Sequence, residues 1–359
     1  MRVVVTGATG NVGTSLLRRL AADPAVESIV GVARRVPSGA GGMRLPGLAW
    51  VAADVAADDL APIVRGAGAV VHLAWAIQPS RDPAALHRAN VLGSARVIEA
   101  VRAAGVPALV HASSVGAYSP GPKDRRVDES WPARGIPSSF YSRHKAEVER
   151  LLDDVEARSP ELRVVRMRPA LTFKAAAAKR VRRLFAGPLV PGALWRPSRI
   201  PAVPDIPGLR VQGVHADDVA EAYRLAVVGD ARGAFNLAAD PVLDPASLAA
   251  ILGARRVPVP APAARAAMDL CWRLRLQPSP PGWLDMALQV PLMDAGRARE
   301  VLGWEPRVDA GAALRELLAG PGSDRAEATP ALEARLGRLS PRAGRRASRA
   351  GRRSAARPR

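Results

Sequence analysis

The chain has 359 residues, 48% of them hydrophobic, and its 52 Lys and Arg against 33 Asp and Glu give a formal net charge of +19. The single cysteine, Cys271, excludes an internal disulfide and suits a reducing compartment. No run reaches the roughly 18 apolar residues of a membrane span, and only three valines precede the first glycine-rich stretch, too few for a secretory signal. We therefore expect a cytoplasmic protein with one two-lobed domain or two small ones.

Half of the positive charge is concentrated at the end of the sequence. Residues 334–359 contain ten arginines and no acid, which leaves +9 for the rest of the chain. From about residue 320 the composition falls to Ala, Arg, Gly, Ser and Pro, so we expect 320–359 to be a disordered Arg-rich tail. The tail has no interleaved aromatic residues, which does not favour a nucleic-acid partner. Nucleic-acid binding predicts that deletion of 334–359 abolishes function, whereas a catalytic function predicts a nearly silent deletion.

The first predicted element is a short buried strand that runs into a glycine-rich loop. Three valines at positions 3–5 precede Gly7, Gly10 and Gly13, and an apolar-periodic helix follows to about residue 22. Gly7 allows a sharp turn, Gly10 allows a pyrophosphate to approach the backbone, and Gly13 allows the helix to pack on the strand. The free N–H groups and positive dipole end of that helix favour phosphate. The loop therefore predicts dinucleotide binding through Gly7, Thr9, Gly10, Asn11, Val12 and Gly13.

Strands and helices alternate after the loop. We expect strands at 28–33, 48–53, 69–74, 107–114 and 162–167, and helices at 56–65, 83–104 and 140–157. This alternation predicts right-handed crossovers and an α/β fold with a Rossmann-type, doubly wound parallel sheet over residues 1–168.

The alternation stops after Pro169. Residues 174–207 are basic and proline-rich, whereas 209–214, 217–227 and 235–237 resemble strand, helix and strand, so we expect 209–240 to return to the Rossmann domain. Further helices are expected at 246–252, 261–275 and 297–302. We assign 169–208 and 241–319 to a smaller, mostly helical C-terminal substrate lobe.

The predicted helix 140–157 carries a candidate catalytic pair. Tyr141 and Lys145 are four residues apart, which places them on one helical face. A nearby ammonium favours the phenolate, so we expect a lowered Tyr141 pKa and proton transfer near neutral pH. The strand before this helix ends at Ser113 and Ser114, and ligands of such sheets bind at the carboxyl ends of the strands. The alternative interpretation is a surface pair for Tyr141 and Lys145 and strand-end caps for the two serines.

Further motifs occur in a fixed order over residues 1–315. They are residues 6–13, Asp54-Val55, His72-Leu73-Ala74, Asn90 with Gly93, Ser113-Ser114 with Tyr118, residues 128–130, Tyr141 with Lys145, Arg168-Pro169 and residues 215–219. Taken together, the chain resembles an extended short-chain dehydrogenase/reductase of the NAD-dependent epimerase/dehydratase family.

The resemblance implies catalytic roles for three side chains. Tyr141 would be the acid/base, and Lys145 would hold the nicotinamide ribose and tune Tyr141. Ser114 would hydrogen-bond the reacting substrate oxygen, with Ser113 as the fallback for that role. No metal site is expected.

The resemblance also implies cofactor contacts outside the glycine loop. Asp54 and Val55 would meet the adenine, and Leu73 and Ala74 would pass beside the cofactor. Arg34 and Arg35 stand where an NAD-preferring fold has an acid, and guanidinium groups suit a 2′-phosphate. We therefore expect NADP rather than NAD, with a solvated arginine pair as the alternative.

The function implied is an NAD(P)-dependent oxidoreductase of the epimerase/dehydratase type, which transfers hydride at a carbinol or ketone carbon of a small molecule. The alternatives are an NADP(H)-dependent ketone or aldehyde reductase, and a non-catalytic NADP-sensing scaffold. Residues 170–173 do not carry the family's usual Tyr-Gly-Pro run, which argues against a nucleotide sugar. The basic stretch 174–183 could clamp an anion or form a solvated helical face. The family commonly pairs through helices that match 83–104 and 140–157, so we expect a homodimer.

Overall fold

A computed structural model describes residues 1–37, 43–77, 81–185, 200–320 and 329. Its centre is a seven-stranded sheet in the order β11-β7-β5-β4-β1-β2-β3, in which all neighbours are parallel. The strands are β1 (Arg2–Thr6), β2 (Ser28–Ala33), β3 (Leu48–Ala52), β4 (Ala69–His72), β5 (Ala108–Ala112), β7 (Arg163–Pro169) and β11 (Gly233–Leu237). The predicted Rossmann-type fold is confirmed.

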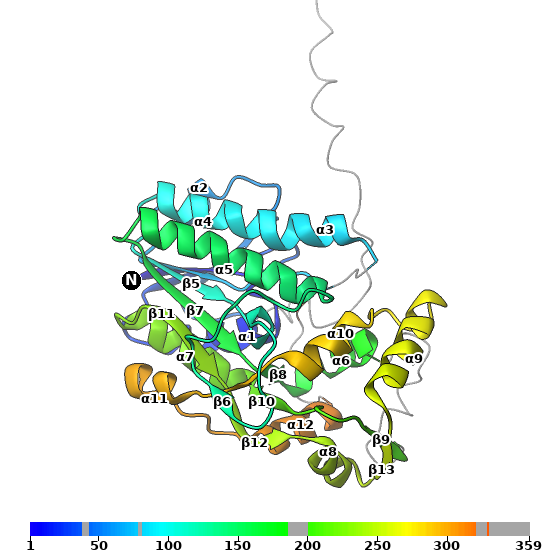
Figure 1. Ribbon diagram of the computed structural model, residues 1–359. Helices are drawn as coiled ribbons and strands as arrows, with labels where there is room; N and C mark the ends of the chain where they lie inside the picture. The colour runs from blue at the N-terminus through cyan, green and yellow to red at the C-terminus, as the bar shows by residue number, and fades with distance from the viewer. Residues whose placement is uncertain (38–42, 78–80, 186–199, 321–328, 330–359) are drawn as a thin grey trace, which may run out of the picture.

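Helices cover both faces of this sheet. On one face lie α2 (Ala61–Val64), α4 (Gly93–Ala103) and α5 (Phe140–Arg158), visible together in Figure 1. The opposite layer contains α1 (Asn11–Ala21) packed against α7 (Ala216–Val228). Each face has its own apolar core, because the valines of the parallel strands alternate between the two layers.

A second set of elements, all but β6 later in the chain than β7, lies outside the main sheet. Its three-stranded sheet has the order β12-β10-β8, and two strand pairs, β13-β9 and β14-β6, accompany it. The strands are β6 (Arg126–Val127), β8 (Leu171–Phe173), β9 (Ala202–Asp205), β10 (Val211–His215), β12 (Ala239–Leu243), β13 (Arg255–Pro258) and β14 (Leu292–Met293). The helices are α6 (Ala178–Phe185), α8 (Pro245–Leu252), α9 (Ala261–Arg273), α10 (Gly282–Gln289), α11 (Gly296–Leu302) and α12 (Ala310–Ala319).

Three expected elements differ from the structure. The helix expected at 56–65 is only Ala61–Val64, because the Asp54 and Asp58 carboxylates hydrogen-bond backbone amides in turns before it. The helix expected at 83–104 is α3 (Pro83–His87), a π-helical turn over Arg88–Leu92, and α4. The strand expected at 209–214 is β10, which pairs with β8 and β12 outside the main sheet, although β11 does pair with β7.

The structure adds two helices to the expected set and describes little of the expected tail. Helices α10 and α12 were not expected, and α12 packs against β10 and β12. The proposed tail, 320–359, lies outside the described residues except for Gly320 and Thr329. The division into a Rossmann domain and a substrate lobe stays a prediction.

Candidate active site

Two glycines of the loop after β1 are required by packing. Gly7 has φ +70°, and a Cβ there would lie 2.6 Å from the Ala74 amide nitrogen. A Cβ on Gly13 would lie 2.6 Å from the carbonyl oxygens of Gly7 and Ala8. The loop and α1 therefore fit together only without these side-chain atoms.

The N-terminus of α1 is open to an anion. Gly10 is the N-cap, no side chain caps the helix, and the first turn contains no acidic residue. Asn11 Oδ1 is buried at this end without a hydrogen-bond partner in the described chain, while Nδ2 donates to the Thr172 carbonyl at 3.3 Å. Free helix N–H groups with an uncompensated dipole suit a pyrophosphate. The loop therefore fits a dinucleotide.

Further cofactor candidates line the same edge of the sheet. Leu73 and Ala74 follow β4, which pairs with β1, and this pairing brings Ala74 against Gly7. Asp54 and Val55 follow β3. Val55 is buried, and the Asp54 carboxylate accepts a hydrogen bond from the amide two residues later at 3.0 Å.

The remaining cofactor candidates lie around the loop and at the end of β2. Arg34 and Arg35 follow β2 with exposed side chains. Thr9 is buried, and its carbonyl accepts a hydrogen bond from Thr329 Oγ1 at 2.9 Å. Val12 is partly buried against the core. One residue of the expected tail thus lies on the glycine loop.

Ser114, Tyr141 and Lys145 come together beyond the end of β5. Ser114 Oγ accepts a hydrogen bond from the Gly116 amide at 3.0 Å and also hydrogen-bonds Tyr141. Tyr141 and Lys145 lie on successive turns of α5, which the Ser139 side chain caps. Lys145 Nζ lies 5.9 Å from the centre of the Tyr141 ring. The structure therefore brings together the three side chains to which the sequence assigns catalysis.

The pKa prediction for Tyr141 is wrong in direction. Burial raises the pKa of Tyr141 above its ordinary value, and the hydrogen bond with Ser114 opposes this only in part. Burial also lowers the pKa of Lys145 to about 7, against the opposing charge of Glu149. Lys145 Nζ donates to the Ala112 carbonyl at 2.6 Å. With a pKa of about 7, Lys145 is only partly charged at neutral pH and stabilises a phenolate less than a fully ionised ammonium would.

Two tryptophans that the sequence analysis missed flank Tyr141. The Trp75 ring meets the Tyr141 ring edge-on at 6.0 Å, and the Trp283 ring lies at 5.1 Å with an interplanar angle of 35°. Lys145 Nζ lies 3.4 Å from the centre of the Trp75 ring. Trp75 directly follows the Leu73-Ala74 motif, a position that could have signalled its place in the site.

A buried charge network lies behind the catalytic side chains. Arg168 makes two hydrogen bonds of 2.9 Å with the Glu149 carboxylate, which also accepts from Arg166 at 3.1 Å and from Ser113 Oγ at 2.5 Å. Arg168 also donates to the Tyr118 hydroxyl at 3.0 Å. The Ser113 hydroxyl donates to Glu149 and not toward Tyr141, so Ser113 is a weaker candidate than Ser114 for the substrate contact. Glu149, four residues after Lys145, could have been found from that spacing.

Two polar residues of the family motifs brace the backbone. Asn90 is fully buried in the π-helical turn, and its amide both donates to and accepts from the backbone of Ala76, at 2.8 and 2.7 Å. His72 lies between the hydroxyls of Thr6 and Ser94, at 2.7 and 2.9 Å. Both residues fix the segment that follows β4.

The basic stretch after β8 does not act as one surface. Lys174 is buried and donates to Ser15 Oγ of α1 at 2.8 Å, whereas Lys179 is exposed. Burial and the nearby charge of Arg34 lower the pKa of Arg180. Arg182 is partly exposed, and the Arg183 side chain lies outside the described residues.

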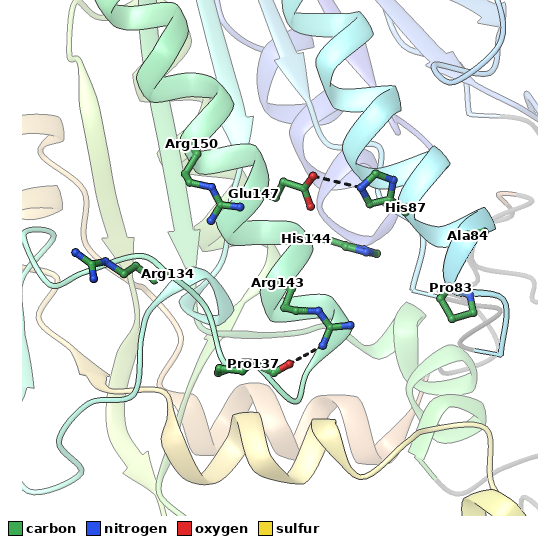
Figure 2. Close-up of a pocket in the computed structure, with 9 residues that line it drawn as sticks. All are labelled: Pro83, Ala84, His87, Arg134, Pro137, Arg143, His144, Glu147 and Arg150. Atoms are coloured by element: carbon green, nitrogen blue, oxygen red, sulfur yellow. Dashed lines mark hydrogen bonds and ion pairs between the residues drawn. The ribbon is translucent and has the colours of Figure 1, made fainter.

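A cavity of about 600 Å³ lies between the first half of α5 and α3 (Figure 2). Its lining residues are Pro83, Ala84, His87, Arg134, Pro137, Arg143, His144, Glu147 and Arg150. His87 Nε2 pairs with Glu147 Oε1 at 3.2 Å, and Arg143 donates to the Pro137 carbonyl at 2.6 Å. None of the three catalytic candidates lines this cavity.

The described residues contain no group of three or more His, Cys, Asp and Glu side chains that could hold a metal. None of the helices in the described ranges combines the length and apolarity that a bilayer crossing requires.

Known proteins are similar to this chain in sequence and in fold. The chain is 29% identical over 266 residues to an uncharacterized protein of Mycobacterium bovis, covering 72% of this chain and 67% of the relative. It is 30% identical over 177 residues to 4-hydroxy-2-methyl-3-oxo-4-farnesyl-3,4-dihydroquinoline-1-oxide ketoreductase of Stigmatella aurantiaca, covering 49% and 51% of the two chains.

A solved structure and a family model complete the comparison. The UDP-glucose 4-epimerase of Thermus thermophilus, solved with NAD, superposes with a TM-score of 0.64 over 89% of this chain and 98% of that one, at 23% identity. The model of the NAD dependent epimerase/dehydratase family matches residues 3–238. The chain therefore belongs to the NAD-dependent epimerase/dehydratase family and is an enzyme of the extended short-chain dehydrogenase/reductase type.

Proposed function

We propose that this enzyme transfers hydride at a carbinol or ketone carbon, with Tyr141 as the acid/base. The observation that carries the proposal is the convergence of Ser114, Tyr141 and Lys145 beside a glycine loop that fits a dinucleotide. When bound, the dinucleotide supplies the hydride carrier. Gly7, Gly10 and Gly13 and the amides of α1 would hold its pyrophosphate, and Lys145 its nicotinamide ribose.

The proton chemistry of the site supports the reductive direction. Tyr141 has a raised pKa and is protonated at neutral pH, so its hydroxyl can give a proton to a carbonyl oxygen as the carbonyl carbon gains hydride. The product is an alcohol, and the tyrosinate regains a proton from solvent. The Ser114 hydroxyl would stabilise the negative charge that develops on the substrate oxygen.

Substitution of Tyr141 tests the catalytic role. We expect Tyr141→Phe to lower kcat by about 10²–10⁴-fold, the usual worth of an acid/base, while dinucleotide affinity stays within a few-fold of wild type. Full turnover by this variant, with an unchanged circular dichroism spectrum, would sink the assignment and favour the non-catalytic scaffold.

We further propose that the cofactor is NADP(H) and that the enzyme is a ketone or aldehyde reductase. Support comes from Arg34 at the end of β2 and from Arg180. The two side chains are close enough that the Arg34 charge lowers the pKa of Arg180. Two guanidinium groups at one edge suit a 2′-phosphate. The relative from Stigmatella aurantiaca is named a ketoreductase, whereas the superposed Thermus protein is an epimerase crystallised with NAD.

Identification of the bound nucleotide separates the two reactions. The purified protein is denatured, any released nucleotide is identified, and the emptied protein is titrated with NADH and NADPH. A reductase should show an empty site that prefers NADPH, and Arg34→Ala should remove that preference. Stoichiometric NAD that stays bound through purification would instead indicate an epimerase or dehydratase with an internal redox cycle.

We also propose a homodimer in which two α5 helices pack antiparallel about a two-fold axis. Exposed Arg143 and Arg150 precede exposed Asp153 and Asp154 along α5, so a two-fold pairing of antiparallel helices matches opposite charges. Sedimentation should give twice the chain mass. Arg150→Glu should weaken the dimer and a second change, Asp154→Arg, should restore it; a monomeric wild type would contradict the proposal.

A further inference from the structure

Lys145 lacks an ion-pair partner in the described part of the chain. One of its three N–H groups donates to the Ala112 carbonyl, and the nearest acid, Glu149, is occupied by Arg168, Arg166 and Ser113. A buried ammonium without a carboxylate needs another source of stabilisation.

The face of Trp75 supplies that stabilisation. The centre of its ring lies 3.4 Å from Lys145 Nζ, within the range of a strong cation–π contact, and the same ring meets Tyr141 edge-on. Asn90 hydrogen-bonds both backbone groups of Ala76, the next residue, and so holds the backbone beside the one that carries the indole.

We propose that Trp75 is a positioning residue of the active site, whose indole face holds the Lys145 ammonium beside Tyr141 and stabilises its positive charge. An aromatic face stabilises the ammonium without accepting a directed hydrogen bond from each of its N–H groups. The N–H groups that do not donate to Ala112 therefore stay available for the hydroxyls of a ligand. A carboxylate in the same place would accept hydrogen bonds from these N–H groups itself. The inference rests on the proposed function only in placing Lys145 in the proton-transfer site.

The titratable neighbours of Lys145 do not change their charge in the pH range in which Lys145 titrates. Glu149 and Tyr141 face it from α5, His72 from β4 and His111 from β5. Burial lowers the pKa of His72 to about 3 and that of His111 well below its ordinary value, so both are neutral where Lys145 titrates. Glu149 is ionised and Tyr141 protonated in the same range.

The experiment is an NMR titration of the ligand-free protein labelled with ¹³C at the lysine ε-carbon. The chain contains only four lysines, Lys123, Lys145, Lys174 and Lys179, so Lys145→Met assigns the signal. We expect Trp75→Leu to lower the midpoint of Lys145 by about one pH unit, the equivalent of a desolvated cation–π contact. Trp75→Phe, which keeps an aromatic face, should lower it by roughly half of that or less.

Two controls keep the result interpretable. Phe140→Leu removes a ring of the same helix that faces His144 and Trp283, and it should leave the Lys145 midpoint unchanged. Thermal melts establish that each variant is folded. If Trp75→Leu does not fold, the titration is carried out on Trp75→Phe. An unchanged midpoint in Trp75→Leu, or equal shifts in the Leu and Phe variants, would overturn the inference.

The titration uses no substrate or cofactor, so its outcome is independent of turnover. If Tyr141→Phe retains full activity, the proposed function fails while the effect of Trp75 on Lys145 can still be observed. If Tyr141→Phe is inactive and the Lys145 midpoint ignores Trp75, only the present inference fails.

Discussion

Arg168 holds Glu149 through two parallel hydrogen bonds of 2.9 Å, both residues being almost fully buried. Burial alone would raise the pKa of Glu149, but the hydrogen bonds and charge of Arg168 outweigh it and hold that pKa at about 2. The pair joins β7 to the middle of α5, one turn beyond Lys145. It therefore fixes the helix that carries the catalytic candidates.

Removal of the Glu149 charge should destabilise the whole fold. Glu149→Gln leaves the Arg168 guanidinium buried without a carboxylate, whereas Arg166 keeps Asp153 and Glu156, and we expect a loss of about 3–5 kcal/mol in the free energy of unfolding. Urea denaturation measures it. Glu147→Gln, which removes only a partly exposed pair with His87, should cost less than about 1 kcal/mol. Equal losses in the two variants would contradict the structural role of Glu149.

The low pKa of Lys145 should appear as a pH dependence of stability. Its ordinary pKa of 10.5 applies to the unfolded chain and about 7 to the folded one. Between these values the unfolded chain binds more protons, so stability rises with pH from about 7 to 10.5, and the penalty is fully present below pH 7. We expect Lys145→Met to flatten the rise in unfolding free energy between about pH 7 and 9, measured by urea denaturation.

Lys123 provides the matched comparison for this titration. Burial lowers its pKa to about 8, and its Nζ donates to the carbonyls of Arg210 and Ala287 at 2.8 Å. Its contribution has the same sign but begins one unit higher, so Lys123→Met should flatten only the upper part of the curve. Parallel curves for wild type and Lys145→Met would show that Lys145 is solvated in the folded protein.

The parts of the site that are local in sequence could be predicted from it. The glycine spacing, the four-residue interval from Tyr141 to Lys145 and the strand–helix alternation each depend on one or two elements. The direction of the Tyr141 pKa could not, because Trp75 and Trp283 come from segments far apart in the chain and bury the ring only after folding. Spacing gives proximity of charges, but desolvation depends on tertiary packing.

The same limit explains the errors in the fold. The sequence of β10 predicts a strand, but it does not predict whether that strand pairs with β7 or with β8. Asp54 and Asp58 compete for backbone amides and shorten the expected helix, an effect that apolar periodicity does not register. The Glu149–Arg168 pair needs β7 and α5 to be packed before it exists.

Adjacent serines should separate catalysis from stability. Ser114 contacts Tyr141, so Ser114→Ala should lower kcat by about 10²-fold, with a loss of about 1 kcal/mol from the hydrogen bond to the Gly116 amide. Ser113 contacts Glu149, so Ser113→Ala should leave kcat within a few-fold and cost about 1.5–3 kcal/mol of stability. Steady-state kinetics and thermal melts of both variants distinguish the two effects. A large loss of kcat in Ser113→Ala with little loss in Ser114→Ala would make Ser113 the catalytic serine.

Two glycines of the loop should likewise separate folding from binding. A Cβ on Gly13 would press on two backbone carbonyl oxygens at 2.6 Å, so Gly13→Ala should destabilise the protein by about 1–3 kcal/mol. A Cβ on Gly10 would approach only the Gly7 carbonyl oxygen, at 3.2 Å, so Gly10→Ala should melt close to wild type. Because Gly10 is the N-cap of α1, that same methyl group would occupy the space proposed for the pyrophosphate, and dinucleotide affinity should fall by about tenfold or more. Calorimetric titration with NADH and NADPH measures this loss, and a Gly10→Ala protein that binds both as wild type does would place the pyrophosphate elsewhere.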